Sequence, residues 1–252
     1  MSHFLDSGAA LLGAVAAGIL TRDELSKAIL LEWEEFARND EAEAPGLMGW
    51  ETEFYGRFIR PGHRVLVVGC GSGRDVVPLV GAGIHMTGLD LAPQAVERCR
   101  RNLERRGLSA ELYAGSVETA CLGRRFDRII FSWFCYSYLP ESGTRVLALQ
   151  NAARHLETGG QVLLSYLLRD ESESNRTQCQ YLAARLSARL SRSAWHPELG
   201  DDFWFWGPLT QRLLRYEHRF TAGEIEVEAR KAGLTVRFHE QRRHGVAMLE
   251  PV

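Results

Sequence analysis

The chain has 252 residues, 45% of them hydrophobic, which is long enough for one well-buried domain with an appendage. Its 30 basic and 32 acidic residues nearly cancel, so no global field favours a polyanionic partner such as nucleic acid. Five cysteines without a CxxC pair argue against a disulfide framework and a structural zinc site, and they favour a reducing, cytoplasmic compartment.

The first 56 residues carry helical patterns and are expected to form a cap segment. Ser7–Leu20 is uncharged, but it is too short to span a bilayer and no Lys or Arg precedes it, so we predict a buried or lid-like helix and no membrane partner. Thr21 and Glu24 form a capping box, and Glu24–Arg38 places its apolar residues near one face of a second helix. Asn39–Gly46 is polar and contains Pro and Gly, which is typical of a linker.

From His63 onward, short apolar strands alternate with amphipathic helices. This alternation predicts a doubly wound α/β fold, a mostly parallel sheet covered on both faces, with ligands at the carboxyl ends of the strands. The predicted strands are Arg64–Val68, His85–Leu89, Glu111–Ala114, Asp127–Ser132, Gln161–Leu167, Thr235–Glu240 and Gly245–Leu249. Predicted helices include Arg74–Val80, Pro93–Arg106 and Gly143–Leu156.

The first of these strands runs directly into a glycine-rich loop, VLVVGCGSGRD over Val65–Asp75. A triphosphate-binding loop needs a Lys after its glycines, and this loop has none. A dinucleotide loop needs its third glycine where Arg74 stands, but here that glycine comes one place earlier. The spacing suits a tight turn beneath a bulky ligand without a phosphate, where any Cβ would obstruct.

Asp90 ends the second strand, seventeen residues after Gly73. A carboxylate at this position can accept hydrogen bonds from both hydroxyls of a ribose. An Asp at a strand end also caps helices in many proteins, but together with the glycine loop the spacing favours ribose binding.

Four segments in this order, VLVVGCGSGRD, GLDLAPQAVERCRRN, RRFDRIIFSWF and HLETGGQVLLSYL, resemble the class I S-adenosylmethionine-dependent methyltransferases. The resemblance covers about Arg57 to Tyr166 and implies the Rossmann-like methyltransferase fold. It divides the chain into a helical cap over 1–56 and a methyltransferase domain over 57–252, with an insertion at about 169–219 that would act as a lid.

The resemblance also implies where S-adenosylmethionine binds. The three loop glycines would wrap its methionine part, and Asp75 would help to hold its ammonium group, directly or through water. Asp90 would bind the ribose, with Leu91 against the adenine. Ser116 stands where the family usually has an Asp for the adenine amino group, and Glu118 is the alternative. The residues predicted to bind the cofactor are Gly69, Cys70, Gly71, Gly73, Asp75, Asp90, Leu91, Ser116, Val117, Ser132 and Trp133.

The acceptor has to be inferred from what surrounds the cofactor. Methyltransferases acting on nucleic-acid bases resemble one another in an Asn/Asp-Pro-Pro-aromatic tetrad after the fourth strand, but Ser132–Cys135 reads SWFC here. No metal-ligand cluster is visible, so no metal is expected. Aromatic residues gather at Trp133–Tyr138 and Phe203–Trp206, where they either pack the core or form an apolar pocket or a cage for a cation. The residues predicted to bind the substrate are Trp133, Tyr136, Phe203, Trp204 and Trp206.

Three residues are candidates for a catalytic role. His218 precedes a predicted helix and titrates in the range useful to a general base. Tyr136 or Tyr138 would orient an acceptor hydroxyl. Methyl transfer mainly needs alignment of the two reactants and a site closed to water, so little further catalytic machinery is expected.

The sequence therefore predicts methyl transfer from S-adenosylmethionine to an oxygen, nitrogen or sulfur atom of a small molecule. Two alternatives remain open: a methyltransferase with an RNA or protein acceptor, and a protein that binds S-adenosylmethionine without catalysis. Neither a nucleic acid nor a membrane is expected as a partner, and the chain is expected to be a monomer or a homodimer.

Overall fold

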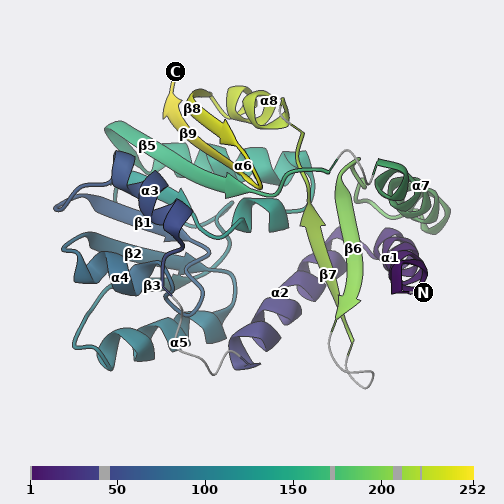
Figure 1. Ribbon diagram of the computed structural model, residues 1–252, viewed down its shortest axis with the longest axis horizontal. Helices are drawn as coiled ribbons and strands as arrows, with labels where there is room; N and C mark the ends of the chain where they lie inside the picture. The colour runs from purple at the N-terminus through teal and green to yellow at the C-terminus, as the bar shows by residue number, and fades with distance from the viewer. Residues whose placement is uncertain (1, 40–45, 171–173, 207–211, 222) are drawn as a thin grey trace.

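The computed structural model describes residues 2–39, 46–170, 174–206, 212–221 and 223–252. Its centre is a seven-stranded sheet with the strand order β3-β2-β1-β4-β5-β9-β8 (Figure 1). The first five strands are parallel, and β9 is antiparallel to both of its neighbours. The strands are β1 (Arg64–Val68), β2 (His85–Asp90), β3 (Glu111–Ala114), β4 (Phe126–Phe131), β5 (Leu156–Tyr166), β8 (Leu234–Gln241) and β9 (Gly245–Pro251).

Helices cover both faces of this sheet because its strands are apolar on both sides. One face packs against α3 (Gly49–Phe58), α4 (Val76–Gly81) and α5 (Pro93–Glu104), which bury residues such as Phe54, Val76 and Leu103. The other face packs against α6 (Ser142–Arg154) and α8 (Glu224–Lys231), which bury Leu149 and Ile225. This is the doubly wound class I methyltransferase arrangement that was predicted.

A second unit, which we call the lid lobe, consists of α1 (Ser2–Ile19), α2 (Arg22–Asn39), α7 (Ser174–Ser191) and the hairpin of β6 (Asp201–Trp206) with β7 (Leu213–His218). It lies beside the sheet in Figure 1 and has a core of its own. The indole of Trp195 donates to the carbonyl of Ala17 at 2.9 Å, although 178 residues separate them. The N-terminal helices and the insertion therefore fold as one body. No helix among the described residues is long and apolar enough to cross a bilayer.

The seven predicted strands of the main sheet are present, with small shifts at their ends. The longest shift is in β5, which begins at Leu156 because that residue pairs with Phe126 before the register slips. The proposed division at residue 57 falls inside α3, which packs on the sheet rather than on the lid lobe. The aromatic cluster Phe203–Trp206 lies in strand β6, where its pairing with β7 supplies the backbone partners.

Candidate active site

A cavity of about 540 Å³ opens at the carboxyl ends of β1, β2, β3 and β4. Its floor is made by the residues that directly follow these strands, including the glycine loop and Asp90. Nine of the eleven residues predicted to bind the cofactor line it: Gly69, Cys70, Gly71, Asp90, Leu91, Ser116, Val117, Ser132 and Trp133. The two others, Gly73 and Asp75, lie behind the wall. The volume lies in the range of small-molecule and cofactor sites.

The three loop glycines all have positive φ, but for different reasons. A Cβ on Gly69 would lie 2.8 Å from Cβ of Cys135, and one on Gly73 would lie 3.0 Å from Sγ of Cys99. Both positions are therefore closed by the protein's own packing. Gly71 has a φ of +51° and no atom within 4 Å of its missing Cβ, and it lines the cavity. Open space beside a left-handed glycine is what a closely approaching ligand needs.

Asp90 is held by two backbone hydrogen bonds. Oδ2 accepts from the Gly71 amide at 2.8 Å, and Oδ1 accepts from the Ala92 amide at 2.9 Å. Burial raises the pKa of Asp90, and these two bonds partly oppose the shift. Each oxygen keeps a further lone pair, so the carboxylate can still accept from a ligand diol, and the two amides fix its orientation.

Asp75 does not reach the cavity, because it is 1% exposed behind Ser132 and Arg74. Its Oδ2 accepts from the hydroxyl of Ser132 at 2.7 Å and from that of Tyr55 at 3.1 Å. Burial raises the pKa of Asp75 to about 6, with Arg74 opposing the shift. A direct contact of Asp75 with the cofactor's ammonium group is therefore not supported, and its role here is to hold the loop wall.

Arg74 lines the cavity, although the sequence singled it out only as the residue in the place of a glycine. Both of its terminal nitrogens bond Glu51 on α3 at 2.5 Å, and its guanidinium carbon lies 4.3 Å from the ring centroid of Trp133. Glu51 is fully buried. Nη2 also lies 2.6 Å from Asp75 Oδ1, so these ion pairs connect α3 to the glycine loop and fix the guanidinium in the cavity wall.

The loop after β3 supplies Ser116, Val117 and Glu118 to the cavity. The carbonyl of Val117 accepts from the Asn151 amide at 2.8 Å, which fixes the loop backbone. Burial raises the pKa of Glu118. Both Ser116 and Glu118 therefore remain candidates for the adenine contact.

The loop after β4 is strained at the cavity mouth. Trp133 and Phe134 have φ values of +43° and +60°, a region that bulky residues rarely adopt and that is found at functional sites. The strain turns Trp133 outward, where it is 40% exposed and lines the cavity.

Tyr138 also lines the cavity, and a cation from the lid lobe holds it. Arg215 donates to the Tyr138 hydroxyl at 3.2 Å and lies within 5.7 Å of the ring centroids of Trp33, Tyr138 and Trp204. It also pairs with Glu32 at 3.4 Å. Burial raises the pKa of Tyr138, so its phenol stays protonated and can donate to a ligand. Trp204 contributes through Arg215 and does not itself line the cavity.

The roof of the cavity is helix α2, which belongs to the predicted N-terminal cap, although none of its residues was among the predicted site residues. Its lining residues are Ser26, Lys27, Ile29, Leu30, Trp33, Phe36 and Ala37. The apolar face that predicted this helix contains several of these residues. The spacing of apolar residues showed that one face of this helix had to be buried. It did not show that a ligand cavity would lie against that face. The helix covers the cavity of its own chain.

Besides Gly73, Asp75 and Trp204, three further predicted site residues lie away from the cavity. Tyr136 is fully buried and donates to Glu228 at 2.6 Å, so it cannot orient an acceptor. Phe203 is fully buried in the core of the lid lobe because its side of β6 faces α1 and Trp195. His218 is likewise fully buried and does not line the cavity, so the structure does not support it as a general base. The side chain of Trp206 lies outside the described residues.

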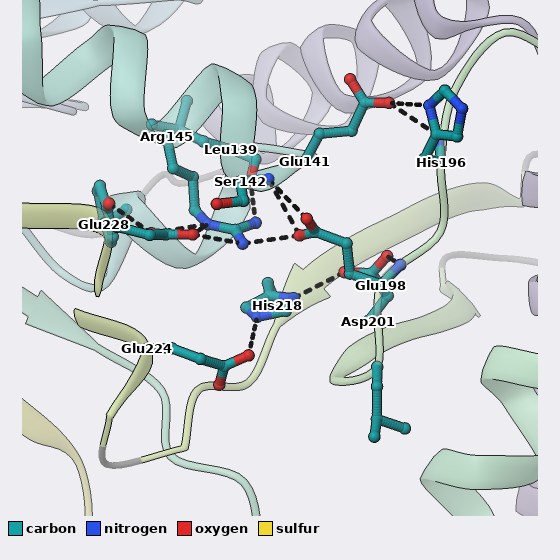
Figure 2. Close-up of polar contacts among 12 residues, drawn as sticks. Leu139, Glu141, Ser142, Arg145, His196, Glu198, Asp201, His218, Glu224 and Glu228 are labelled. Carbon is teal, nitrogen blue, oxygen red and sulfur yellow. Dashed lines mark hydrogen bonds and ion pairs between the residues drawn. The ribbon is translucent and has the colours of Figure 1, made fainter. Parts of the chain in front are cut away.

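Figure 2 shows what His218 does instead. Its Nδ1 lies 2.8 Å from Asp201 Oδ1, and its Nε2 lies 3.7 Å from Glu224 Oε1 on α8. Burial and Arg145 lower the pKa of His218, but the two carboxylates outweigh them, so the pKa is raised. His218 thus connects the base of the lid lobe to the methyltransferase sheet.

Glu198, Asp201 and His218 bring potential metal-ligand atoms within 4.8 Å of one another. Their oxygens already have partners: Glu198 accepts from Arg145 at 2.7 Å (Figure 2), and Asp201 accepts from Tyr216 at 2.9 Å. The Arg145 guanidinium also pairs with Glu228 at 2.8 Å. The group is therefore a buried ion-pair network centred on Arg145.

Comparison with known proteins agrees with this geometry. Residues 65–160 match a family model described as a methyltransferase domain. The chain is 36% identical over 121 residues to the ribosomal protein L11 methyltransferase of Dechloromonas aromatica, a match that covers 47% of this chain and 37% of that protein. It is 32% identical over 129 residues to the ubiquinone biosynthesis O-methyltransferase of Aromatoleum aromaticum, covering 50% of each. The chain thus spans half or less of the length of these relatives.

Among solved structures, a SAM-dependent methyltransferase from Methanosarcina mazei superposes with a TM-score of 0.64 at 16% identity, covering 82% of this chain and 99% of that one. The chain therefore has the class I methyltransferase fold, and its residues 65–160 match a methyltransferase domain. S-adenosylmethionine is the cofactor that the sequence resemblance implies for this site. The residues fit this cofactor, because Gly71 leaves room for it and Asp90 offers two fixed acceptors to its ribose. When bound, it supplies an activated methyl group on a sulfonium.

Proposed function

We propose that this protein transfers a methyl group from S-adenosylmethionine to a small molecule held under helix α2. The observation that carries the proposal is the cavity itself, which the glycine loop lines on one side and α2 lines on the other. A small acceptor fits a cavity roofed by a helix, whereas a macromolecule needs an open approach.

In this proposal the chain's own residues position the reactants and exclude water. Apolar side chains of α2, such as Ile29 and Trp33, close the roof, and a closed site strengthens polar contacts within it. The Tyr138 phenol, held by Arg215, donates to the acceptor and orients it. No histidine lies among the described lining residues, which favours an acceptor that needs no protein base, such as an amine or a thiol.

The binding test is calorimetry with S-adenosylmethionine and S-adenosylhomocysteine on the wild type and on Asp90→Ala. We expect micromolar binding that the substitution weakens at least about tenfold, because a ribose loses both acceptors. Binding no tighter than millimolar in the wild type, with no effect of the substitution, would exclude the cofactor site.

The acceptor test is turnover of labelled cofactor against a panel of small amines, thiols and phenols, with total RNA and ribosomal protein in parallel. Transfer to a member of the panel supports the proposal. Labelling of ribosomal protein would favour the activity named for the Dechloromonas relative. Tight binding without transfer to any acceptor would favour the non-catalytic alternative.

A further inference from the structure

The outer side of the lid lobe is built in an unusual way. Helix α1 packs inward through its small residues: a Cβ on Gly18 would lie 2.3 Å from the Ala184 carbonyl oxygen of α7, and one on Gly13 would lie 3.0 Å from that of Phe203. From residue 8 onward its large side chains point outward, with Leu12 67% and Ile19 55% exposed. An ordinary surface helix of a globular protein has the opposite arrangement.

Helix α7 adds a second apolar row. Leu182, Leu186 and Leu190 repeat every four residues, so they lie on one side of the helix, and they are 54%, 60% and 76% exposed. The two helices lie side by side at the end of the molecule farthest from the main sheet (Figure 1). We call their exposed apolar residues the outer lid face. These residues are Leu11, Leu12, Val15, Ile19, Leu182, Leu186 and Leu190.

Exposed apolar side chains are more concentrated on the outer lid face than on the rest of the described surface. This face holds seven of the 16 large hydrophobic side chains that are exposed in the described residues. Single exposed leucines are common, but a cluster over two packed helices marks a contact surface.

The charged side chains beside the leucine row of α7 are arginines. Arg185 and Arg189 lie beside the leucine row on α7. Around the helix axis they are roughly 60° to 100° from Leu186. Arg192 comes just after the end of the helix. Neither Ser174–Ser191 nor the described part of α1 from residue 8 contains an acidic residue. Among the described residues, neither Arg189 nor Arg192 pairs with a carboxylate. The rim therefore complements an anionic partner.

We propose that the outer lid face lies on an anionic membrane surface, with its leucines at the boundary of the acyl chains and its arginines at the lipid phosphates. An apolar stripe with arginines beside it is the composition of helices that lie in the membrane interface, and each arginine near an anionic surface adds about 1 kcal/mol. A second copy of the chain fits less well, because antiparallel packing through the leucine row would bring the two arginine flanks together. This placement needs no spanning helix.

The inference goes beyond the proposed function, and the structure connects the two. The outer lid face and the cavity roof belong to one body, since α1, α2 and α7 share the core that contains Ala14, Leu25 and Ala184. A bilayer contact at the outer lid face would hold that body, and the apolar cavity beneath it, at the lipid surface.

The test is co-sedimentation of the full chain with vesicles of phosphatidylcholine alone and of phosphatidylcholine with phosphatidylglycerol. We expect binding to the anionic vesicles that weakens as salt is raised. Leu186→Gln with Leu190→Gln should weaken it at least about tenfold, because two buried leucines are lost. Arg189→Gln with Arg192→Gln should weaken it by about thirtyfold. Val227→Gln, which is 44% exposed on α8, is the matched control and should bind like the wild type.

Three outcomes would overturn the proposal: no binding to either kind of vesicle, equal loss in the Val227→Gln control, or a dimer in sedimentation equilibrium that the double leucine variant dissociates. Circular dichroism and calorimetry with S-adenosylhomocysteine on each variant check folding. They also separate this proposal from the catalytic one, since vesicle binding without cofactor binding would refute only the proposed function.

Discussion

At the scale of single residues, the glycine loop shows how one motif serves two purposes. Gly69 and Gly73 are required by the protein's own packing against Cys135 and Cys99. Gly71 alone has open space on the cavity side. Substitution at Gly71 should therefore separate ligand binding from stability.

We predict that Gly71→Ala lowers affinity for S-adenosylhomocysteine at least about tenfold, because the new methyl group occupies ligand space. The strained φ costs about 1 kcal/mol of stability. The matched control is Gly107→Ala, which has a φ of +64° and equally open surroundings in an exposed turn. It should show the same loss in urea unfolding with unchanged affinity in calorimetry. Equal affinities in the two variants would contradict the assignment of Gly71.

Glu32 is a second residue whose behaviour depends on its surroundings, because burial changes the pKa of its carboxyl group. It is 1% exposed beside Arg215, and burial raises its pKa from 4.5 to about 7. A carboxyl whose pKa is higher in the folded state stabilises the fold below its unfolded pKa, and this contribution is lost as pH rises through the folded value.

We predict that Glu32→Gln stabilises the protein at pH 8 by about 2 kcal/mol relative to its effect near pH 4.5, because the glutamine carries no buried charge. Glu224→Gln provides the contrast. His218 and Thr221 hold the pKa of Glu224 at about 2, so its contribution is present above pH 4.5 and is lost as pH falls toward 2. That variant should be less stable at pH 8. Urea unfolding across this pH range measures both, and a pH-independent Glu32→Gln difference would contradict the prediction.

At the scale of elements, the site depends on contacts between helices and the loops after the strands. Helix α3 is held to the glycine loop by Glu51 with Arg74 and by Tyr55 with Asp75. Breaking a buried ion pair by removing one partner leaves an uncompensated charge, which costs far more than loss of an exposed pair.

We predict that Glu51→Gln destabilises the chain by about 3 kcal/mol and also weakens cofactor binding, because Arg74 lines the cavity. Glu53→Gln on the same helix is the control. Its side chain is 60% exposed where it pairs with Arg57, so its loss should change stability by less than about 0.5 kcal/mol. Urea unfolding and calorimetry give the two readouts. A similar effect of the two substitutions would show that the Arg74 contact does not hold the loop.

At the scale of the whole molecule, the lid lobe joins two segments that the central motifs leave unexplained, the N-terminal helices and the insertion after β5. Its helix α2 roofs the cavity, and His218 and Arg145 connect its base to the sheet. A ligand in the cavity should therefore stabilise distant segments together.

We predict that S-adenosylhomocysteine at about a hundredfold excess over its dissociation constant slows amide exchange in α2 at least about tenfold, since ligand binding then adds about 2.7 kcal/mol. Exchange in β7 should slow as well, because Arg215 and Glu32 connect the two elements. The exposed turn at Gly107 serves as the internal reference. Protection of the glycine loop without protection of α2 would show that the roof moves independently of the ligand.

The sequence by itself determined the sheet, the glycine loop and Asp90. Strand periodicity, loop spacing and left-handed glycines are local requirements of the backbone, so they are readable without knowing any distant partner. Nine of the eleven predicted cofactor residues line the cavity for this reason. The predicted set itself stays a prediction until binding is measured.

Only the tertiary structure decided which residues surround the part of the cavity where we propose that the acceptor binds. Phe203 and His218 were candidates by residue type, and packing across the lid lobe buried both. Trp33, Arg74 and Arg215 entered the site through partners far along the chain, as when Trp195 meets Ala17 across 178 residues. Contacts at such separations depend on which apolar faces meet during folding, and no local pattern encodes that choice.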